Sequence, residues 1–232
     1  ALLDRDGVYG APRFHKAALA AGIKPIVGCE LTIAPSSFAC SHGEPRRGLA
    51  EASAKADDLR PSSRMARPGS PLARLWRLPV LVESQAGYRN LCRLLTRMKL
   101  DVPKGEGILT LDDLEGCTTG LVALAGRAAL MGHRYGVGGL LDRLVGLFGR
   151  SQIYVELQRH LLRNEASDNQ ALITLADAYR VPLIATNGVR FAVAEDRPLY
   201  DMQTCLRHKT TLDRAGRRLA CNAERYLKSP AA

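Results

Sequence analysis

The sequence lacks the short signals that most often assign a chain to a class. Its six cysteines form no Cys-x-x-Cys pair, so neither a zinc knuckle nor a disulfide framework is indicated; they are Cys29, Cys40, Cys92, Cys117, Cys205 and Cys221. No apolar run approaches the roughly 18 residues of a membrane span, and no secretory signal peptide is visible. The glycines form no phosphate-binding loop of the G-x-x-x-x-G-K or G-x-G-x-x-G type. We therefore expect a cytoplasmic protein with reduced thiols and no membrane partner.

The composition is that of a globular chain with an excess of positive charge. The 232 residues suffice for one large α/β domain or two small ones, and 46% of them are hydrophobic. The net charge is +10, and arginine supplies most of it. This balance fits a nucleic-acid partner, but it also fits a GC-rich genome that encodes positive charge as arginine. The chain begins without Met, directly on the motif "LLDRDG", so we expect a fragment or the product of a truncated gene.

Apolar runs typical of buried strands alternate with amphipathic stretches typical of helices. Strands are predicted at residues 24–33, 77–84, 120–126, 151–160 and 181–187, and helices at 11–22, 86–100, 109–116, 137–149, 164–180 and 196–208. Strands separated by helices of this length predict βα units with parallel strands, whose two faces are both covered. The expected fold class is therefore α/β.

Residues 35–76 interrupt the alternation. The stretch has five prolines between residues 35 and 75, many Ser, Ala and Arg, neither Val nor Ile, and no apolar period. A segment of this kind inside a compact domain predicts a low-complexity, disordered insertion. Two other interpretations stay open, namely a weak helix at 48–59 and a basic arm that touches DNA.

Several motifs, taken in order, resemble a known family. "LLDRDGVYGAPRFHKAALAAGIKPIVGCELTI" resembles the second and third motifs of the PHP (polymerase and histidinol phosphatase) domain. "LPVLVESQAGYRNLCRLLTRMKL", "YVELQRH", "PLIATNGVRF" and "DMQTCLRHKTTLDRAGRRLACNAERYLKSP" resemble the PHP region of bacterial DNA polymerase III alpha-type polymerases, most of all the error-prone subfamily. The resemblance implies a distorted β/α barrel, incomplete at the N-terminus because its first strand and helix would precede residue 1. It divides the domain into residues 1–34 and 77–212, and makes 213–232 the start of a connection to the polymerase palm.

The resemblance also implies a site at the carboxyl ends of the strands. In metal-binding members, His, Asp, Glu and Cys side chains there hold divalent ions that activate water against phosphoesters. The family's first ligands, in an H-x-H motif, would precede residue 1. Among the matched positions this chain retains one acidic ligand, Glu30 in "GCE". At the other matched positions it has Arg5, Arg77, Arg127, Gly188 and Arg190.

Arginine stays protonated and has no lone pair for a metal, but it can pair with the carboxylates that remain. We therefore expect no bound metal or other cofactor, and a degenerate site in which Arg5, Arg127 and Arg190 converge on Glu30. The full set of candidate residues is Asp4, Arg5, Asp6, Glu30, Arg77, Arg127, Glu156, His160, Asn187 and Arg190. For three of them a structural role is also open. Asp4 and Asp6 can shape the turn before Gly7, and His160 can be a hydrogen-bonded histidine at a strand end.

The resemblance implies a part of a DNA-directed DNA polymerase that copies damaged templates. Its catalytic Mg²⁺ would lie in a palm domain outside these residues, so this fragment would be an inactive scaffold. The implied partners are DNA, a sliding clamp and mutagenesis accessory proteins. Candidate DNA contacts, which can equally form a solvated basic surface, are Arg207, His208, Lys209, Arg214, Arg217 and Arg218. Two alternatives remain: a stand-alone PHP phosphoesterase, such as a histidinol phosphatase, and an inactive remnant of a truncated polymerase gene.

Overall fold

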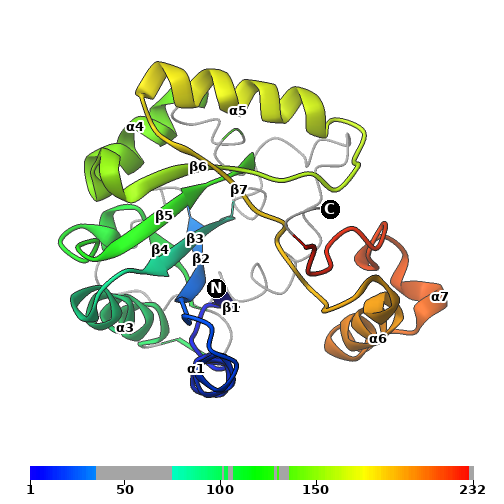
Figure 1. The fold of residues 1–232 in the computed structure, drawn as a ribbon. Coiled ribbons are helices and arrows are strands. Elements are labelled where there is room, and N and C mark those ends of the chain that lie inside the picture. The colour runs from blue at the N-terminus through cyan, green and yellow to red at the C-terminus, as the bar shows by residue number, and fades with distance from the viewer. Residues whose placement is uncertain (35–74, 101, 104–106, 128–129, 131–135, 230–232) are drawn as a thin grey trace.

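A computed structural model describes residues 1–34, 75–100, 102–103, 107–127, 130 and 136–229. Its centre is a seven-stranded sheet in the order β1-β2-β3-β5-β6-β7, with β4 paired to β2 (Figure 1). The strands are β1 (Leu2–Arg5), β2 (Val27–Ala34), β3 (Trp76–Val82), β4 (Leu109–Thr110), β5 (Leu121–Ala125), β6 (Ile153–Leu157) and β7 (Leu183–Ala185). Within the described residues the sheet does not close into a full barrel.

The helices confirm the predicted order of elements. They are α1 (Ala11–Ala20), α3 (Gln85–Lys99), α4 (Gly136–Phe148), α5 (Glu165–Tyr179), α6 (Arg197–Arg207) and α7 (Leu212–Ala215). Short 3-10 turns are η5 (Asp112–Leu114), η7 (Arg150–Gln152), η8 (Ala194–Asp196) and η9 (Gly216–Arg218). The short helix expected at 109–116 is thus the strand β4 followed by the turn η5. None of the helices in the described part of the chain is long and apolar enough to cross a membrane.

Local signals place the helix ends where the sequence predicts them. After α1, Gly22 has φ +68°, and the Ile23 N–H reaches back to the carbonyl of Ala18 at 2.8 Å, as in a glycine C-cap. Ser84 caps α3 by accepting a hydrogen bond from the Gly87 N–H at 3.2 Å. The predicted apolar face of α3 is buried at Leu91, Leu94, Leu95 and Met98, whereas Tyr88 is 42% exposed.

The direction of β3 differs from the prediction. β1, β4, β6 and β7 are each parallel to a neighbour, but β3 is antiparallel to both β2 and β5. The prediction of parallel strands throughout was wrong at β3, because an apolar run reads the same in either chain direction. One consequence matters for the site. The first residues of β3 lie at the edge of the sheet where β1 and β2 end, so Arg77 sits opposite Thr32 of β2.

The two faces of the sheet differ in chemistry. One face carries fully buried apolar side chains, and α3, α4 and α5 pack against it to form the core; these side chains include Cys29, Leu31, Ile33, Leu78, Val80, Ala123, Ile153 and Val155. Because successive side chains of a strand point to opposite faces, Glu30 and Thr32 belong to the other face, with Arg5 and Arg77 as their register partners. Glu30, Thr32, Arg5 and Arg77 thus share one side of the sheet, opposite the core.

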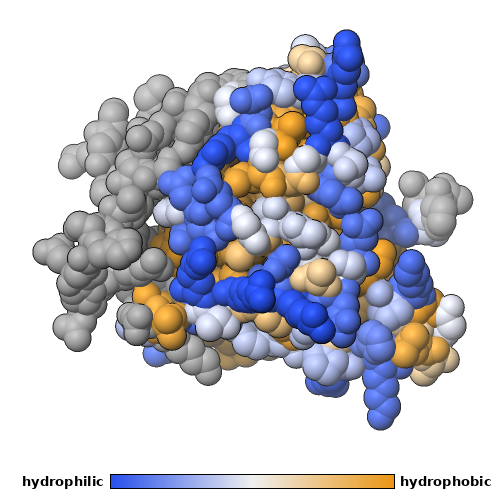
Figure 2. Space-filling model, turned by 90° about the vertical axis from the view of Figure 1, so that its left-hand side faces the viewer, coloured by the Kyte–Doolittle hydropathy of each residue, from blue (hydrophilic) through white to orange (hydrophobic). Residues whose placement is uncertain are grey.

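The remaining surface is mixed. Figure 2 shows the side that lies on the left of Figure 1, where hydrophilic side chains are spread among small apolar areas. On the opposite side, α6 and α7 lie apart from the helices that cover the core (Figure 1). The chain after α7 then returns to the sheet. We call residues 220–228 the return segment, because its backbone is bonded to the stretch after β7: the Arg190 N–H donates to the Arg225 carbonyl at 2.8 Å, and the Leu227 N–H to the Ala192 carbonyl at 3.2 Å.

The predicted insertion and the weak helix at 48–59 fall almost entirely outside the described residues, so both stay predictions. Their flanks give a direct test. Ile33 near the end of β2 and Trp76 at the start of β3 are antiparallel register partners, so a short hairpin turn can join the two strands. We expect that replacing residues 35–74 by a four-residue turn leaves the thermal midpoint within a few degrees or raises it, because a shorter connection costs less entropy to close. Calorimetry of both proteins measures this, and a large fall in the midpoint would mean that the segment packs against the domain.

Candidate functional site

Glu30 lies at the centre of the polar face and between two guanidinium groups. Its Oε2 lies 3.6 Å from Nη1 of Arg77, and its Oε1 lies 3.5 Å from Nη2 of Arg190. The three side chains are 19%, 29% and 30% exposed, respectively, so they are partly shielded from water. The pairing with Arg190 was predicted from the sequence. The pairing with Arg77 was not, because it depends on the reversed direction of β3.

The motif at the end of β1 forms its own compact set of contacts. Asp4 Oδ2 accepts a hydrogen bond from the Gly10 N–H at 2.6 Å, and the Asp6 carboxylate accepts from both the N–H and the hydroxyl of Thr32 at 2.8 Å. Asp6 has φ +50°, a left-handed conformation that aspartate tolerates better than most residues. Arg5 Nε lies 3.5 Å from Asp6 Oδ2. The Asp4 carboxylate thus bonds across the turn that contains Gly7, whereas that of Asp6 ties the turn to β2.

Arg127 does not belong to the Glu30 cluster. It follows β5, and its guanidinium forms an ion pair with Asp168 in the first turn of α5. The prediction that Arg127 converges on Glu30 is therefore wrong. The partner comes from a helix 41 residues further along the chain, and no local pattern in the sequence links the two.

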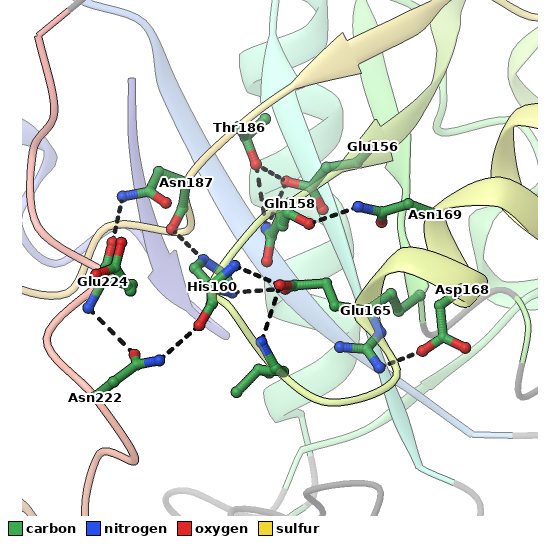
Figure 3. A network of polar contacts seen from close by, with 12 residues as sticks. Glu156, Gln158, His160, Glu165, Asp168, Asn169, Thr186, Asn187, Asn222 and Glu224 are labelled. Carbon is green, nitrogen blue, oxygen red and sulfur yellow. Dashed lines mark hydrogen bonds and ion pairs between the residues drawn. The ribbon is translucent and has the colours of Figure 1, made fainter. Parts of the chain in front are cut away.

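Glu156 forms a separate hydrogen-bonded group at the end of β6 (Figure 3). Its Oε1 accepts from the Thr186 hydroxyl at 2.5 Å and from Gln158 Nε2 at 3.0 Å, and that Nε2 also lies 3.2 Å from Thr186 Oγ1. Gly126 packs so closely here that a Cβ on it would meet Glu156 Oε2 at 2.8 Å. Gln158 lies two residues after Glu156, so in extended backbone their side chains point to the same side and can meet. The contacts hold the ends of β6 and β7 together.

His160 is buried and bonded on several sides (Figure 3). Its Nε2 lies 2.8 Å from the Asn187 carbonyl, to which it donates, and its backbone N–H donates to Glu165 Oε2 at 2.6 Å. Its own carbonyl accepts from Asn222 Nδ2 at 2.6 Å. His160 therefore has the contacts of a structural histidine, and it ties the end of β6 to α5 and to the return segment.

Burial lowers the pKa of His160, and the charges of Arg225 and Lys228 add to this, against an opposing effect of the Glu165 carboxylate. The folded protein therefore takes up this proton at a lower pH than the unfolded chain, in which histidine titrates near pH 6.5. As pH falls through 6.5, the unfolded state binds more protons, so we expect the free energy of unfolding to fall by at most about 1.4 kcal/mol per pH unit.

Denaturant titrations at several values between pH 7.5 and 5.5 measure this slope. The variant His160→Gln should flatten the slope, whereas His15→Gln on the exposed side of α1 should leave it unchanged. Equal slopes for the unmodified protein and His160→Gln would contradict the assignment.

The return segment brings a further arginine to the site. Asn187, which follows β7, donates from Nδ2 to the carbonyl of Glu224 at 2.8 Å (Figure 3). It also donates to the carbonyl of Tyr226 at 2.7 Å, and thereby holds the segment at the strand ends. The residue between them, Arg225, is partly buried. Burial lowers the pKa of its guanidinium, as does the charge of Arg190, whereas Glu30 raises it. Arg225 was not predicted from the sequence, because it matches none of the family's ligand positions and lies in a stretch assigned to a connection.

Gly188 has a backbone reason for its identity. It adopts φ +50°, in the left-handed region that glycine occupies at no steric cost, and a Cβ there would lie 3.1 Å from Gln158 Nε2. The glycine that stands at a family ligand position therefore fits the turn that carries the chain from Asn187 towards Arg190.

The basic run predicted to contact DNA lies away from Glu30, around the end of α6 and on α7 and η9. Its members are exposed, apart from half-buried His208; they are Arg207, His208, Lys209, Arg214, Arg217 and Arg218. Lys209 has φ +48° where the chain turns out of α6. The run is thus available at the surface, and contact with DNA stays a prediction.

The Glu30 cluster does not fit a multinuclear metal centre. Within the described ranges, no three His, Cys, Asp or Glu side chains gather in a group that could hold a metal ion. The nearest thiol, Cys29, points to the core face, and burial raises its pKa to about 12, so it would not ionise to a thiolate ligand at neutral pH. What the arrangement offers instead is guanidinium groups around one carboxylate.

Comparison with known proteins identifies the family of this chain. A PHP domain model matches residues 1–160. The chain belongs to the PHP domain family. It is 33% identical over 235 residues to an error-prone DNA polymerase of Anaeromyxobacter dehalogenans, a match that covers 99% of this chain and 17% of that protein. It is 30% identical over 239 residues to DNA polymerase III subunit alpha of Pseudomonas aeruginosa, covering 100% of this chain and 18% of that protein.

These matches confirm the resemblance on which the sequence analysis relied. A third relative, an error-prone DNA polymerase of Rhodopseudomonas palustris, is 39% identical over 148 residues, which cover 64% of this chain and 13% of the relative. This PHP domain is homologous to the N-terminal region of both kinds of polymerase. It spans less than a fifth of their length.

Proposed function

We propose that this PHP domain is part of an error-prone, translesion-type DNA polymerase and serves it as a scaffold without hydrolytic activity of its own. The observation that carries the proposal is the setting of Glu30. Its two oxygens face Arg77 and Arg190, each at a position matched to a metal ligand of active relatives. Guanidinium groups compensate the carboxylate charge but cannot activate water as a metal does.

The surface of α6 supports a place within a longer polypeptide. Leu199, Met202 and Leu206 follow one another at helical spacing and are 57%, 54% and 77% exposed. The side turned inward instead buries Asp201 and Thr204. An apolar stripe that faces outward is typical of a helix that packs against another domain. The relatives, of which this chain covers less than a fifth, have further chain to supply such a partner.

The remaining parts of the proposal rest on the family resemblance described from the sequence. Nucleotide transfer would use Mg²⁺ held by the palm of the longer polymerase, and the scaffold would lie close to DNA, with the basic run around α7 facing the phosphate backbone. A sliding clamp and mutagenesis accessory proteins would bind the polymerase as a whole. Primer extension across an abasic site by the full-length gene product tests this part.

The absence of hydrolysis can be tested on the chain itself. We expect the purified protein to retain no stoichiometric zinc or manganese, and to cleave neither phosphomonoesters nor phosphodiesters when manganese is added. Elemental analysis and a phosphate-release assay measure the two outcomes. Arg190→His should not restore metal binding, because Gly188 and Arg77 still lack ligand atoms. Metal-dependent cleavage by the unmodified chain, lost in Glu30→Gln, would instead identify a phosphoesterase.

A further inference from the structure

Arg190 and Arg225 hold two positive charges close together at the carboxyl ends of the strands. The Arg190 N–H donates to the Arg225 carbonyl at 2.8 Å, which fixes the two residues side by side. The charge of Arg190 acts on the Arg225 guanidinium against its protonated form. Two like charges in a partly shielded place are costly unless negative charge compensates them.

The described residues supply too little negative charge for this pair. The carboxylate ion-paired with Arg190 is Glu30, and Glu30 also faces Arg77. Among the described residues the Arg225 guanidinium has no ion pair or side-chain hydrogen bond of its own. Of the charges that act on this guanidinium, that of Arg190 disfavours its protonated form, and the Glu30 carboxylate favours it.

Contacts between several elements hold the residues around Arg225 in place. Three elements converge there: β2 carries Glu30, the stretch after β7 carries Arg190, and the return segment carries Arg225. The return segment is held there by Asn187, through two hydrogen bonds on either side of Arg225, and by Asn222, which donates to the His160 carbonyl. Because both flanks of Arg225 are fixed, its backbone stays at the strand ends, and binding a ligand there has to order only the side chain.

We propose that Arg190 and Arg225 form a metal-independent binding site for a phosphate group at this edge of the sheet. A phosphate dianion carries the negative charge that the described residues do not supply to the two guanidiniums, and its oxygens accept the paired N–H groups of arginine in bidentate fashion. The group can come from free inorganic phosphate or from the phosphorylated end of a nucleic acid, since both present the same oxygens.

Thermal unfolding in EDTA tests the site without metals. Inorganic phosphate should raise the Tm of the unmodified chain above its value in sodium chloride of equal ionic strength. A phosphate titration followed by calorimetry should show the Kd raised at least about tenfold in Arg225→Gln, since a charged hydrogen bond contributes this much or more. Arg89→Gln removes the same charge from the exposed side of α3 and should leave the Kd unchanged.

Binding of two oligonucleotides, one with and one without a 5′-phosphate, distinguishes a nucleic-acid end from free phosphate as the ligand. If a 5′-phosphorylated single strand binds more tightly than the same strand without phosphate, and Arg225→Gln abolishes the difference, the ligand is a nucleic-acid end. If the two strands bind alike while inorganic phosphate still stabilises the protein, the ligand is free phosphate. Both results support the site.

A second measurement needs no variant, in case Arg225→Gln does not fold. Phenylglyoxal modifies accessible guanidiniums, and mass spectrometry locates the modified residues. Phosphate should slow the modification of Arg190 and Arg225 but not that of Arg89. Equal stabilisation by phosphate and chloride, or modification of Arg225 at an unchanged rate in phosphate, would overturn the proposal.

Discussion

Gly87→Ala is expected to destabilise the domain by about 2 to 3 kcal/mol, although alanine is the better helix former. Gly87 lies in the first turn of α3, where the helix approaches the turn before β5 without any space for a side chain. A Cβ at this position would meet the carbonyl oxygen of Gly120 at 1.8 Å and the carbonyl carbon at 2.4 Å. These are backbone atoms, so the helix as a whole would have to shift.

The contacts around Gly87 make such a shift costly. The Glu83 N–H donates to the Gly120 carbonyl at 3.0 Å, and Asn90 Nδ2 donates to the Thr119 carbonyl at 2.9 Å, so two hydrogen bonds hold the helix start against the turn. Gly120 itself has φ +75° and cannot easily relax with a larger neighbour. Moving α3 away would also separate Leu91 and Leu94 from the core.

Gly146→Ala is the matched control. Gly146 lies inside α4 and is exposed, and a Cβ there would meet nothing within 4 Å. We expect this variant to gain up to about 1 kcal/mol, because alanine restricts the unfolded chain more than glycine does. Denaturant titrations of both variants measure the change in the free energy of unfolding, which should be a loss for Gly87→Ala and a gain for Gly146→Ala. A neutral or stabilising Gly87→Ala would contradict the close approach of α3 to Gly120.

The sequence predicts most elements of this fold, because each element has its own spacing of apolar residues and its own residues that begin or end it. The buried face of α3 could be read from the spacing of Leu91, Leu94, Leu95 and Met98, and the end of α1 from Gly22. The direction of a strand in the sheet could not be predicted in this way. The apolar pattern of a strand such as β3 is the same in either chain direction, so the antiparallel pairing of β2 with β3 is known only from the structure.

In the candidate site, too, some contacts could be predicted from the sequence and others could not. Glu30 and Arg190 could be paired from motif positions alone, because the family resemblance assigns both to one site; Glu30 lies within β2, and Arg190 follows β7. Arg127 was assigned to the same cluster but pairs with Asp168, whose position depends on how α5 packs. Arg225 gave no signal at all, because its place depends on the return of the chain after α7. Contacts between distant segments depend on how the elements pack. A sequence motif predicts such a contact only where the chemistry of the family requires the residues to meet.

Glu30→Gln is expected to destabilise the domain by about 2 to 3 kcal/mol, since it leaves Arg77 and Arg190 beside an uncharged amide. The loss is set below that of a fully buried pair because the three side chains are 19% to 30% exposed and water can enter. For a domain of this size the loss corresponds to a fall in Tm on the order of 5–10 °C. Denaturant and thermal unfolding at low ionic strength measure it.

Glu115→Gln is the control that separates burial from pairing. Glu115 also forms an ion pair with an arginine, to Arg143 Nη2 at 2.5 Å, but its side chain is 58% exposed. We expect the loss there to stay within about 0.5 kcal/mol, as for other exposed pairs. Adding Arg190→Gln to Glu30→Gln should recover part of the loss, because it removes one of the charges left without its partner. If Glu30→Gln and Glu115→Gln cost the same, the guanidinium groups around Glu30 do not stabilise the strand ends, and the scaffold role proposed for them fails.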